Sequence, residues 1–326
     1  MRLPRDLLRR VAGPAVVVDG NVLDVQVQVM LDAARRLGIV DSDDVEESRR
    51  RNEEDAAVVA PSAPEMASER DAIVDGSGGP LRARVYRPRT AREGAGMLVY
   101  LHGGAFVFGS VAVYEPAVKM LAHESGVPIA SIEYRLAPEH KFPAAVDDAV
   151  AALRWARERA ADFGADPARV GIGGDSAGGN LAAIACHLAR DARPAHQLLI
   201  YPAVDWWRRG ESHRSCGAGF FLEEQRTHWA EKHYLNRIEE RDDPRATPLA
   251  FDRFDDLPPA TIVTAGFDIL RDEGRLYAET LAKAGVAVDF CCETSLIHGF
   301  FNMGGVIDAA RAANARLAAR LAAALA

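Results

Sequence analysis

The sequence predicts an α/β fold in which helices cover a mostly parallel sheet on both faces. Short β-rich runs alternate with helical segments along most of the chain. The β-rich runs are almost continuously apolar, as strands buried on both faces are. The composition is that of an ordinary globular chain, with 326 residues, 48% hydrophobic and 26% charged. A chain of this length can bury one large core, so we expect one large domain or one with a small appendage.

The alternation defines the expected elements in chain order. The strands are expected at Leu81–Val85, Met97–Leu101, Ile129–Tyr134, Val170–Gly173, Leu198–Tyr201, Thr261–Ala265 and Val288–Cys292. The helices are expected at Ala144–Ala160, Ala177–Arg190, Glu273–Ala284 and Ile307–Leu325. The last of these is rich in Ala and Arg and is amphipathic, which is typical of a helix that covers a sheet.

The N-terminal stretch does not follow the alternation. Up to about Val59 we expect one helix, whose apolar positions are Val25, Val29, Ala33 and Leu37, then a stop at Gly38 and a second, charged helix. In that second helix, Arg49–Arg51 precede Glu53–Asp55, which indicates a solvated face whose charges compensate each other. These helices are expected to be attached to the core, and Pro61 and Pro64 begin a polar linker.

A second irregular stretch lies between Tyr201 and Thr261. It contains no comparable strand, but it has several aromatic residues and a helical pattern at Glu223–Leu235. An insertion of this length between two strands is more often a functional lid than a plain connection.

Charge and cysteine content exclude several classes of function. The chain has 39 basic and 47 acidic side chains, a net charge of −8, which argues against a nucleic-acid partner. The four cysteines, Cys186, Cys216, Cys291 and Cys292, lack metal-ligand spacing. We therefore expect no metal, reduced thiols and a cytoplasmic location. The apolar run Val11–Val18 contains Gly13 and Pro14, so we expect neither a signal peptide nor a stable membrane insertion.

The most informative motif is Gly174–Gly178, which matches G-x-S-x-G between a predicted strand and a predicted helix. In this context the serine, Ser176, lies on a sharp turn with strained backbone, and the flanking glycines allow neighbouring chain to pass closely. Taken alone, the pattern also fits a glycine-rich turn that only packs tightly. A nucleotide-binding interpretation fails, because Ser176 stands where G-x-G-x-x-G needs its third glycine.

Two places can supply donors for an oxyanion hole. The N–H of Ala177 lies at the start of a helix, where unpaired amides and the positive end of the helix dipole favour negative charge. The turn His102–Phe106 follows an earlier strand, and its Gly103 and Gly104 can direct their amides toward one point. His102 itself is expected to be a hydrogen-bonded residue and not a base.

A serine nucleophile needs a base that is oriented by an acid. In α/β-hydrolases the chain order is Ser, then Asp or Glu, then His, and His298 is the histidine that follows the late strands. Asp268 comes directly after a strand, at the sheet edge where open α/β sheets place their sites. Asp272 and Glu273 are expected to be first-turn helix charges. His228 and His233 are expected to be surface or lid residues.

These motifs together resemble the hormone-sensitive-lipase-like branch of the α/β-hydrolases, which includes many bacterial carboxylesterases. The segments that carry the resemblance are His102–Phe106, Tyr134–Glu139, Gly174–Asn180, Asp268–Glu273 and His298–Phe300. The resemblance covers the chain from about Leu81 and implies a two-part helical cap. We therefore expect residues 1–60 and 205–250 to form the cap, and residues 61–204 and 251–326 to form the two parts of the core.

The sequence departs from the family pattern at two positions. Ala105 replaces the third glycine of H-G-G-G, which adds bulk beside the acyl group, and Ile269 replaces a proline after the acid, which loosens the turn. The Tyr134–Glu139 segment is expected to shape a buried loop with an Arg135–Glu139 ion pair. Asp147 and Asp148 are expected to cap the next helix.

The substrate pocket is expected to be apolar. Its candidate residues are Ala105, Phe106, Asp175, Trp206, Trp207, Phe220, Phe221, Ile269 and Phe300. The cap aromatics among them can equally serve to hold the cap together.

We therefore expect a serine carboxylesterase that acts on short- to medium-chain esters and uses no cofactor. Its partner is a small-molecule ester. The same residues also suit an amidase, a lactonase or a carbamate hydrolase. Plant relatives that act as hormone receptors have lost the catalytic histidine, according to the resemblance, whereas His298 is present here. An edge strand at Val288–Cys292 could support a homodimer.

Overall fold

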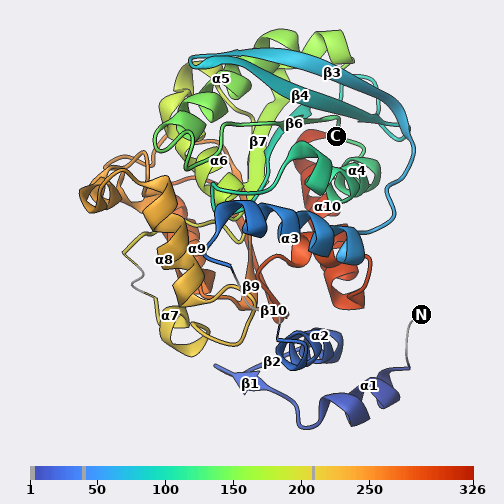
Figure 1. The fold of residues 1–326 in the computed structure, drawn as a ribbon. Coiled ribbons are helices and arrows are strands. Elements are labelled where there is room, and N and C mark those ends of the chain that lie inside the picture. Colours follow the sequence, from blue (N-terminus) through green and yellow to red (C-terminus); the bar gives the residue numbers. More distant parts are fainter. Residues whose placement is uncertain (1–3, 39–41, 208–209) are drawn as a thin grey trace.

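The computed structural model describes residues 4–38, 42–207 and 210–326, and it confirms the α/β fold. Eight strands form one sheet in the order β10-β9-β8-β7-β5-β6-β4-β3, and helices cover both of its faces (Figure 1). The strands from β10 to β6 are parallel, while β4 pairs antiparallel with both β6 and β3. The carboxyl ends of the parallel strands therefore meet at one edge of the sheet.

Every predicted strand is present. The strands of the large sheet are β3 (Met66–Gly76), β4 (Gly79–Pro88), β5 (Met97–Leu101), β6 (Ile129–Ile132), β7 (Val170–Asp175), β8 (Gln197–Ile200), β9 (Ala260–Phe267) and β10 (Val288–Ile297). The polar stretch after Pro61 is not only a linker, because it contains the edge strand β3. Most of its side chains are exposed or half-buried, so it lacks the apolar run by which the inner strands are identified.

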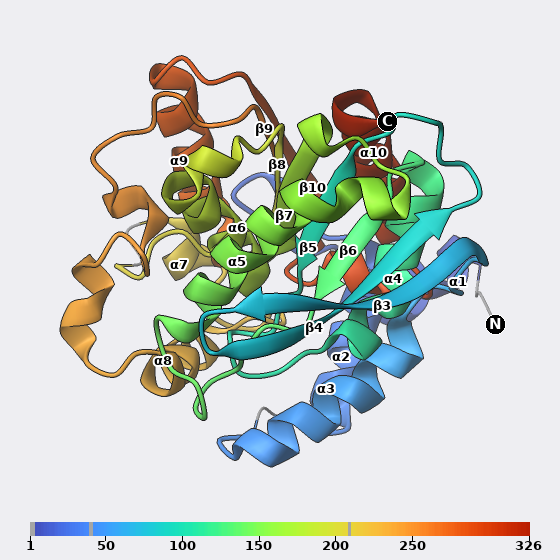
Figure 2. The ribbon, with the colours of Figure 1, turned by 90° about the horizontal axis from the view of Figure 1, so that it is seen from above.

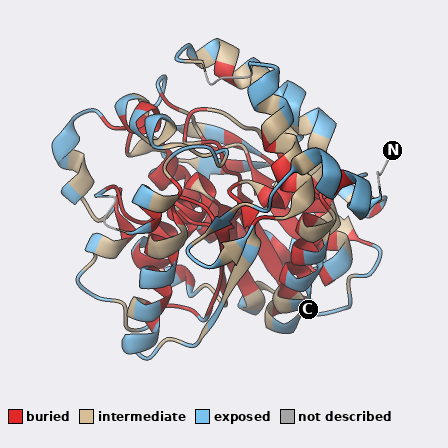
Figure 3. Ribbon diagram, turned by 90° about the horizontal axis from the view of Figure 1, so that it is seen from below, coloured by how far each residue is buried: buried red, intermediate tan, exposed pale blue. Residues whose placement is uncertain are grey.

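The helices lie in two layers. The helices α5 (Ala144–Arg159), α6 (Ala177–Leu188) and α9 (Arg271–Lys283) cover one face, and α4 (Val111–Ser125) and α10 (Asp308–Leu325) cover the other (Figure 2). Alternate residues of β5 enter the two cores: Val99 and Leu101 face the first layer, whereas Leu98 and Tyr100 face the second. The core is thus centred on the sheet (Figure 3).

Sequence reasoning missed α4. Pro116 lies inside this helix and interrupts the pattern that predicts one. The Ser110 hydroxyl accepts the Val113 N–H and caps its start, and Gly126 ends it with a φ of 72°.

The N-terminal segment consists of α1 (Arg5–Ala12), the short strands β1 (Val17–Val18) and β2 (Asn21–Val22), and the helices α2 (Val25–Arg36) and α3 (Val45–Val59). Both predicted helices are present, but the predicted apolar face of α2 is wrong. Val27 and Leu31 are buried against the core, whereas Leu37 is 75% exposed. The actual stripe is offset by two residues from the predicted one, since it includes Leu23 from the preceding turn.

The insertion after β8 carries the short helix α7 (Ser212–Ser215) and the helix α8 (Glu224–Tyr234), on the opposite side of the molecule from α4 (Figure 1). His228 and His233 lie on α8, as expected of residues in the insertion. No helix in the described ranges combines the length and the apolar character needed to cross a bilayer. The predicted strand at Val288–Cys292 begins the edge strand β10, and the homodimer stays a prediction.

The predicted Arg135–Glu139 ion pair is wrong. Arg135 instead binds Asp148, with 2.6 Å between Nη2 and Oδ1, and its backbone N–H donates to the same carboxylate. Asp148 is fully buried on α5, so it neutralises a guanidinium in place of capping the helix. Glu139 binds Arg49 of α3, with 2.7 Å between Oε2 and Nη2.

Three buried histidines make stability depend on pH. Burial lowers the pKa of His102 and His196 to about 4 and that of His187 to about 3, from 6.5. A depressed folded-state pKa contributes stability above pH 6.5, which is lost as the pH falls through the folded pKa. Burial raises the pKa of Asp175 to about 6 and also raises that of Glu273, which works in the opposite sense.

As the pH is lowered near pH 5, we expect the free energy of unfolding to fall by about 1.4 to 3 kcal/mol per pH unit. The reason is that the unfolded chain binds about one to two more protons than the folded chain at this pH. Urea denaturation at about pH 7, 6 and 5 would measure this slope. His196→Gln can keep a bond to Thr261, which lies 3.0 Å from His196 Nε2, and should flatten the slope. An unchanged slope in this variant would show that His196 is not buried in its neutral form.

Candidate active site

Ser176 lies at the sharp turn from β7 to α6, as predicted. Its φ of 55° and ψ of −116° are strained for a residue with a Cβ. The flanking glycines are required by close approach: a Cβ would lie 2.2 Å from the Leu101 carbonyl oxygen at Gly174, and 1.9 Å from it at Gly178. Close packing against β5 therefore holds the serine above the sheet.

Ser176, His298 and Asp268 meet at the carboxyl edge of the sheet. The His298 Nε2 lies 2.9 Å from the Ser176 Oγ, and its Nδ1 lies 2.8 Å from the Asp268 Oδ2. With the ring proton on Nδ1, His298 donates to Asp268 and accepts from the serine hydroxyl. The structure thus brings together three residues that are up to 122 positions apart.

The acid is held by its own loop. Asp268 directly follows β9, is fully buried and accepts the Leu270 N–H at 2.9 Å with its Oδ1. The turn after the acid is therefore closed by hydrogen bonds despite Ile269. His298 directly follows β10, and Gly299 beside it has a φ of 77°. The two residues are positioned by the ends of adjacent parallel strands.

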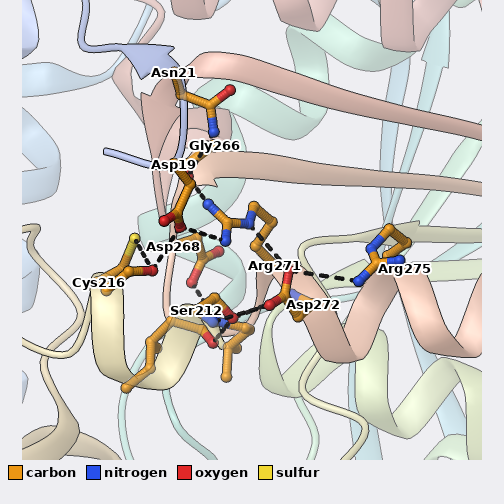
Figure 4. A network of polar contacts seen from close by, with 12 residues as sticks. Asp19, Asn21, Ser212, Cys216, Gly266, Asp268, Arg271, Asp272 and Arg275 are labelled. Atoms are coloured by element: carbon orange, nitrogen blue, oxygen red, sulfur yellow. Dashed lines mark hydrogen bonds and ion pairs between the residues drawn. The ribbon is translucent and has the colours of Figure 1, made fainter. Parts of the chain in front are cut away.

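Arg271 supports this acid loop from the side. Its guanidinium donates to the Gly266 carbonyl at 2.9 Å, to Asp19 at 2.7 Å and to Asp272 at 3.2 Å (Figure 4). Asp272 also accepts the Ser212 N–H at 2.9 Å. Asp272 is therefore part of a network between the loop and the insertion, and its role is more than that of a first-turn helix charge.

One of the three predicted oxyanion donors, Gly103, is contradicted by the structure. The Gly103 N–H donates to the Asp175 Oδ1 at 2.8 Å and is therefore not available to a substrate oxygen, so the assignment of Gly103 is wrong. Within the described part of the chain, no group accepts the N–H of Gly104, Ala105 or Ala177. Gly104 and Ala105 have φ values of 121° and 54°, so the chain here is neither helix nor strand. Their consecutive N–H groups are therefore not used in regular backbone hydrogen bonds. These three amides are the candidate donors.

Asp175 is not a pocket residue. Its buried carboxylate accepts the Tyr100 hydroxyl at 2.8 Å and the Gly103 N–H at 2.8 Å, and the hydroxyls of Tyr114 and Tyr201 at 3.3 and 3.4 Å. Burial raises the pKa of Asp175 to about 6, although the bonds from Tyr100 and Gly103 oppose this shift. Asp175 thus fixes the turn that precedes Gly104. His102 is likewise buried, and its Nδ1 lies 2.7 Å from the Gly103 oxygen, as expected of a hydrogen-bonded residue.

A pocket of about 530 Å³, including its open mouth, lies over Ser176 and beneath the insertion. Of the predicted lining residues it contains Ala105, Phe106 and Trp206. Phe106 is stacked on Tyr234 of α8 with 3.9 Å between the ring centroids. The remaining lining residues are Ser176, Ala177, Ala203, Asp205, His213, Leu222, Arg226, Thr227, Ala230, Leu270 and Glu273.

The other predicted pocket residues lie elsewhere. Trp207 is 48% exposed beneath Arg241, and Phe220 packs on Phe267 at 5.2 Å between centroids. Phe221 is 55% exposed and lies beside Gly299. Ile269 and Phe300 are buried; the Ile269 carbonyl accepts the Ser212 hydroxyl, and Phe300 packs against Tyr201. Of the insertion aromatics predicted to line the pocket, only Trp206 does so.

Sequence reasoning missed Glu273 and His213. Glu273 is buried, accepts the N–H groups of Val204 and Asp205 at 2.7 and 3.2 Å, and lies 3.3 Å from the His213 Nε2. Glu273 lies in the first turn of α9, as predicted, but it is buried and binds the insertion. It holds the start of the insertion against α9 and forms part of the pocket wall. The sequence feature that could have pointed to Glu273 as a residue of the site is its position five residues after Asp268.

Comparison with known proteins gives a consistent result. The family described as alpha/beta hydrolase fold matches residues 98–302. The carboxylic ester hydrolase LipN of Mycobacterium tuberculosis is 42% identical over 309 residues, which cover 90% of this chain and 80% of LipN. The ethyl acetate hydrolase of Pseudomonas putida is 38% identical over 275 residues, covering 82% of this chain and 86% of that protein.

Two solved structures are also similar. The ester hydrolase EH1AB1, from the metagenome of Lake Arreo, has a TM-score of 0.88 at 38% identity and covers 92% of this chain and 98% of its own. The thermophilic carboxylesterase EstE1, cloned from a metagenomic library, has a TM-score of 0.82 at 40% identity, with 87% and 98% covered.

Proposed function

The chain belongs to the hormone-sensitive-lipase-like branch of the α/β hydrolase family and is a carboxylic ester hydrolase, and we propose that it acts through an acyl-enzyme on Ser176. The observation that carries this proposal is the continuous hydrogen-bonded relay from Asp268 through His298 to the serine oxygen. Residues 1–60 and 205–250 form the cap in this proposal, and residues 61–204 and 251–326 form the core.

In the first half of the reaction, Ser176 attacks the ester carbonyl carbon while His298 Nε2 takes the hydroxyl proton. Asp268 stabilises the resulting imidazolium and keeps its Nδ1–H in place. The amides of Gly104, Ala105 and Ala177 donate to the tetrahedral oxyanion. His298 then gives its proton to the leaving alkoxide, the C–O bond breaks, and the alcohol departs.

In the second half, a water molecule attacks the acyl carbonyl and gives a proton to His298. The same amides stabilise the second oxyanion. The carboxylic acid leaves as His298 returns the proton to the Ser176 oxygen, which restores the starting state.

The shape and lining of the pocket support a preference for short to medium acyl chains. Most of the wall is apolar, and its two large aromatic residues, Phe106 and Trp206, both pack against the Tyr234 ring. The insertion covers the pocket, so the substrate is expected to enter as a dissolved monomer.

A chain-length series would test this substrate range. We expect kcat/KM for p-nitrophenyl esters to be highest on butyrate or hexanoate and to fall on laurate and palmitate, because longer chains exceed the pocket. A maximum on palmitate, or a rise in rate on emulsified triglyceride, would contradict the proposed preference.

Added methanol tests the acyl-enzyme in the same assay. If one butyryl-enzyme forms, the ratio of methyl butyrate to butyric acid must be the same for phenyl and p-nitrophenyl butyrate. A ratio that changes with the leaving group would exclude a common intermediate.

A further inference from the structure

Arg49 of α3 reaches from the N-terminal segment into the loop that carries the candidate oxyanion donors. Its Nε donates to the Val107 carbonyl at 3.0 Å, and its Nη2 donates to the Ala137 carbonyl at 3.1 Å. Both Nη atoms also bind the Glu139 carboxylate, at 2.8 and 2.7 Å. The Arg49 side chain is 24% exposed, so this arginine does not belong to the solvated face that its neighbours suggest.

The position of Val107 makes this contact relevant to catalysis. The preceding residues Gly104, Ala105 and Phe106 all have positive φ, which is costly for the two that are not glycine. Such a turn persists only where surrounding groups hold it. The Phe106 carbonyl accepts the Ala137 N–H at 2.9 Å, so Arg49 binds one partner of this contact, Ala137, and the residue that directly follows the other, Val107.

The neighbouring arginine of the same helix has no such role. Arg50 binds Glu47 and Glu54 on α3 itself, and its side chain is 55% exposed.

The pair between Arg49 and Glu139 is bidentate, and such arginine–carboxylate pairs combine charge with fixed geometry. The Arg49 guanidinium holds the pKa of Glu139 at about 2, which agrees with this pairing.

A second residue of the N-terminal segment reaches the acid loop. Asp19 lies in the turn between β1 and β2, and its Oδ2 accepts Arg271 at 2.7 Å (Figure 4). The same oxygen accepts the Ser215 hydroxyl of α7 at 2.7 Å. Arg271 in turn binds the Gly266 carbonyl, two residues before Asp268. One carboxylate therefore links the N-terminal segment, the insertion and the loop of the catalytic acid.

We infer that the N-terminal segment braces the active site at two points, with Arg49 as a positioning residue for the oxyanion loop and Asp19 as a positioning residue for the acid loop. Neither side chain lines the substrate pocket. Both act through the loops they hold, on the transition state more than on substrate binding. This inference rests on the function proposed above. It adds that the reaction depends on the N-terminal segment, which is one part of the proposed cap.

The test of the first brace compares Arg49→Ala and Arg49→Lys with Arg50→Ala as the matched control. We expect kcat on p-nitrophenyl butyrate, per serine titrated with a fluorophosphonate, to fall about tenfold in Arg49→Ala with KM changed less than twofold, because loosened donors misplace the oxyanion. The kcat of Arg49→Lys, which keeps one charged donor group, should lie between those of Arg49→Ala and the wild type. Arg50→Ala should match the wild type. Titration of the serine removes any misfolded fraction from the comparison.

The second brace is tested with Asp19→Ala and Asp19→Asn. The control is Asp32→Ala, which removes an ion pair with Arg35 on α2 alone. We expect a fall in kcat of about threefold to tenfold in Asp19→Ala, a smaller fall in Asp19→Asn, and none in the control. Variants that fold, titrate fully and keep the kcat of their controls would overturn the inference. An active Ser176→Ala enzyme would instead overturn the proposed function, so the two failures are distinguishable.

Discussion

Replacing Ser176 by alanine is expected to lower kcat on p-nitrophenyl butyrate by about a millionfold, the scale found when a triad nucleophile is removed. The substitution deletes the oxygen that lies 2.9 Å from the His298 Nε2. No covalent intermediate can then form, and the residual rate comes only from the oxyanion donors and substrate binding. Stopped assays at high enzyme concentration, with protein purified apart from the wild type, would measure it.

The fold of this variant should be intact. Alanine keeps the Cβ, and its N–H can still donate the backbone hydrogen bond to the Ile200 carbonyl. Ser176→Gly provides a second check. It should be equally inactive yet more stable by about 1 kcal/mol, since glycine adopts the positive φ without strain. Turnover above about one-hundredth of the wild-type value in either variant would mean that another group attacks the ester.

The three residues of the hydrogen-bonded relay could be selected from the sequence because each depends on local pattern and chain order. Ser176 is identified by the flanking glycines that a strand-to-helix turn requires. The close approach of the Leu101 carbonyl explains why no larger residue fits at Gly174 or Gly178. Asp268 and His298 follow adjacent parallel strands, and buried strands are the elements that an apolar run identifies best.

The assignments that failed depend on contacts between distant segments. The direction of the Gly103 amide is set by Asp175, which lies 72 residues away in the chain and on another strand. Phe220 and Phe221 were expected in the pocket because they are aromatic and lie in the insertion, but the packing of the insertion decides which aromatics face Ser176. Composition does not contain that information.

The environment of charged residues is not predictable from local sequence for a related reason. Arg49 and Arg50 are adjacent, and each makes an ion pair within α3, yet Arg49 is half-buried against core loops whereas Arg50 is exposed. A rotation of 100° between consecutive helical residues separates the two environments. Glu273 likewise matches the pattern of a dipole charge, and only the return of the insertion over α9 buries it.

Asp268→Asn is expected to lower kcat by about ten thousandfold, more than its small change in shape suggests. The Asp268 Oδ1 accepts the Leu270 N–H at 2.9 Å, so an asparagine would place its oxygen there and direct its NH₂ group at His298. The ring would then have to accept at Nδ1 and carry its proton on Nε2, where it can no longer take the proton of Ser176.

The same geometry predicts an unusual order among variants at this position. Asp268→Ala leaves the ring free to adopt either tautomer, so its kcat should be at least as high as that of Asp268→Asn although it removes more atoms. Steady-state kinetics on p-nitrophenyl butyrate, normalised by titrated serine, would rank the two. If asparagine retained more than about a tenth of wild-type kcat, the Leu270 amide would not be fixing the orientation of residue 268, and the tautomer of His298 would be set by another partner.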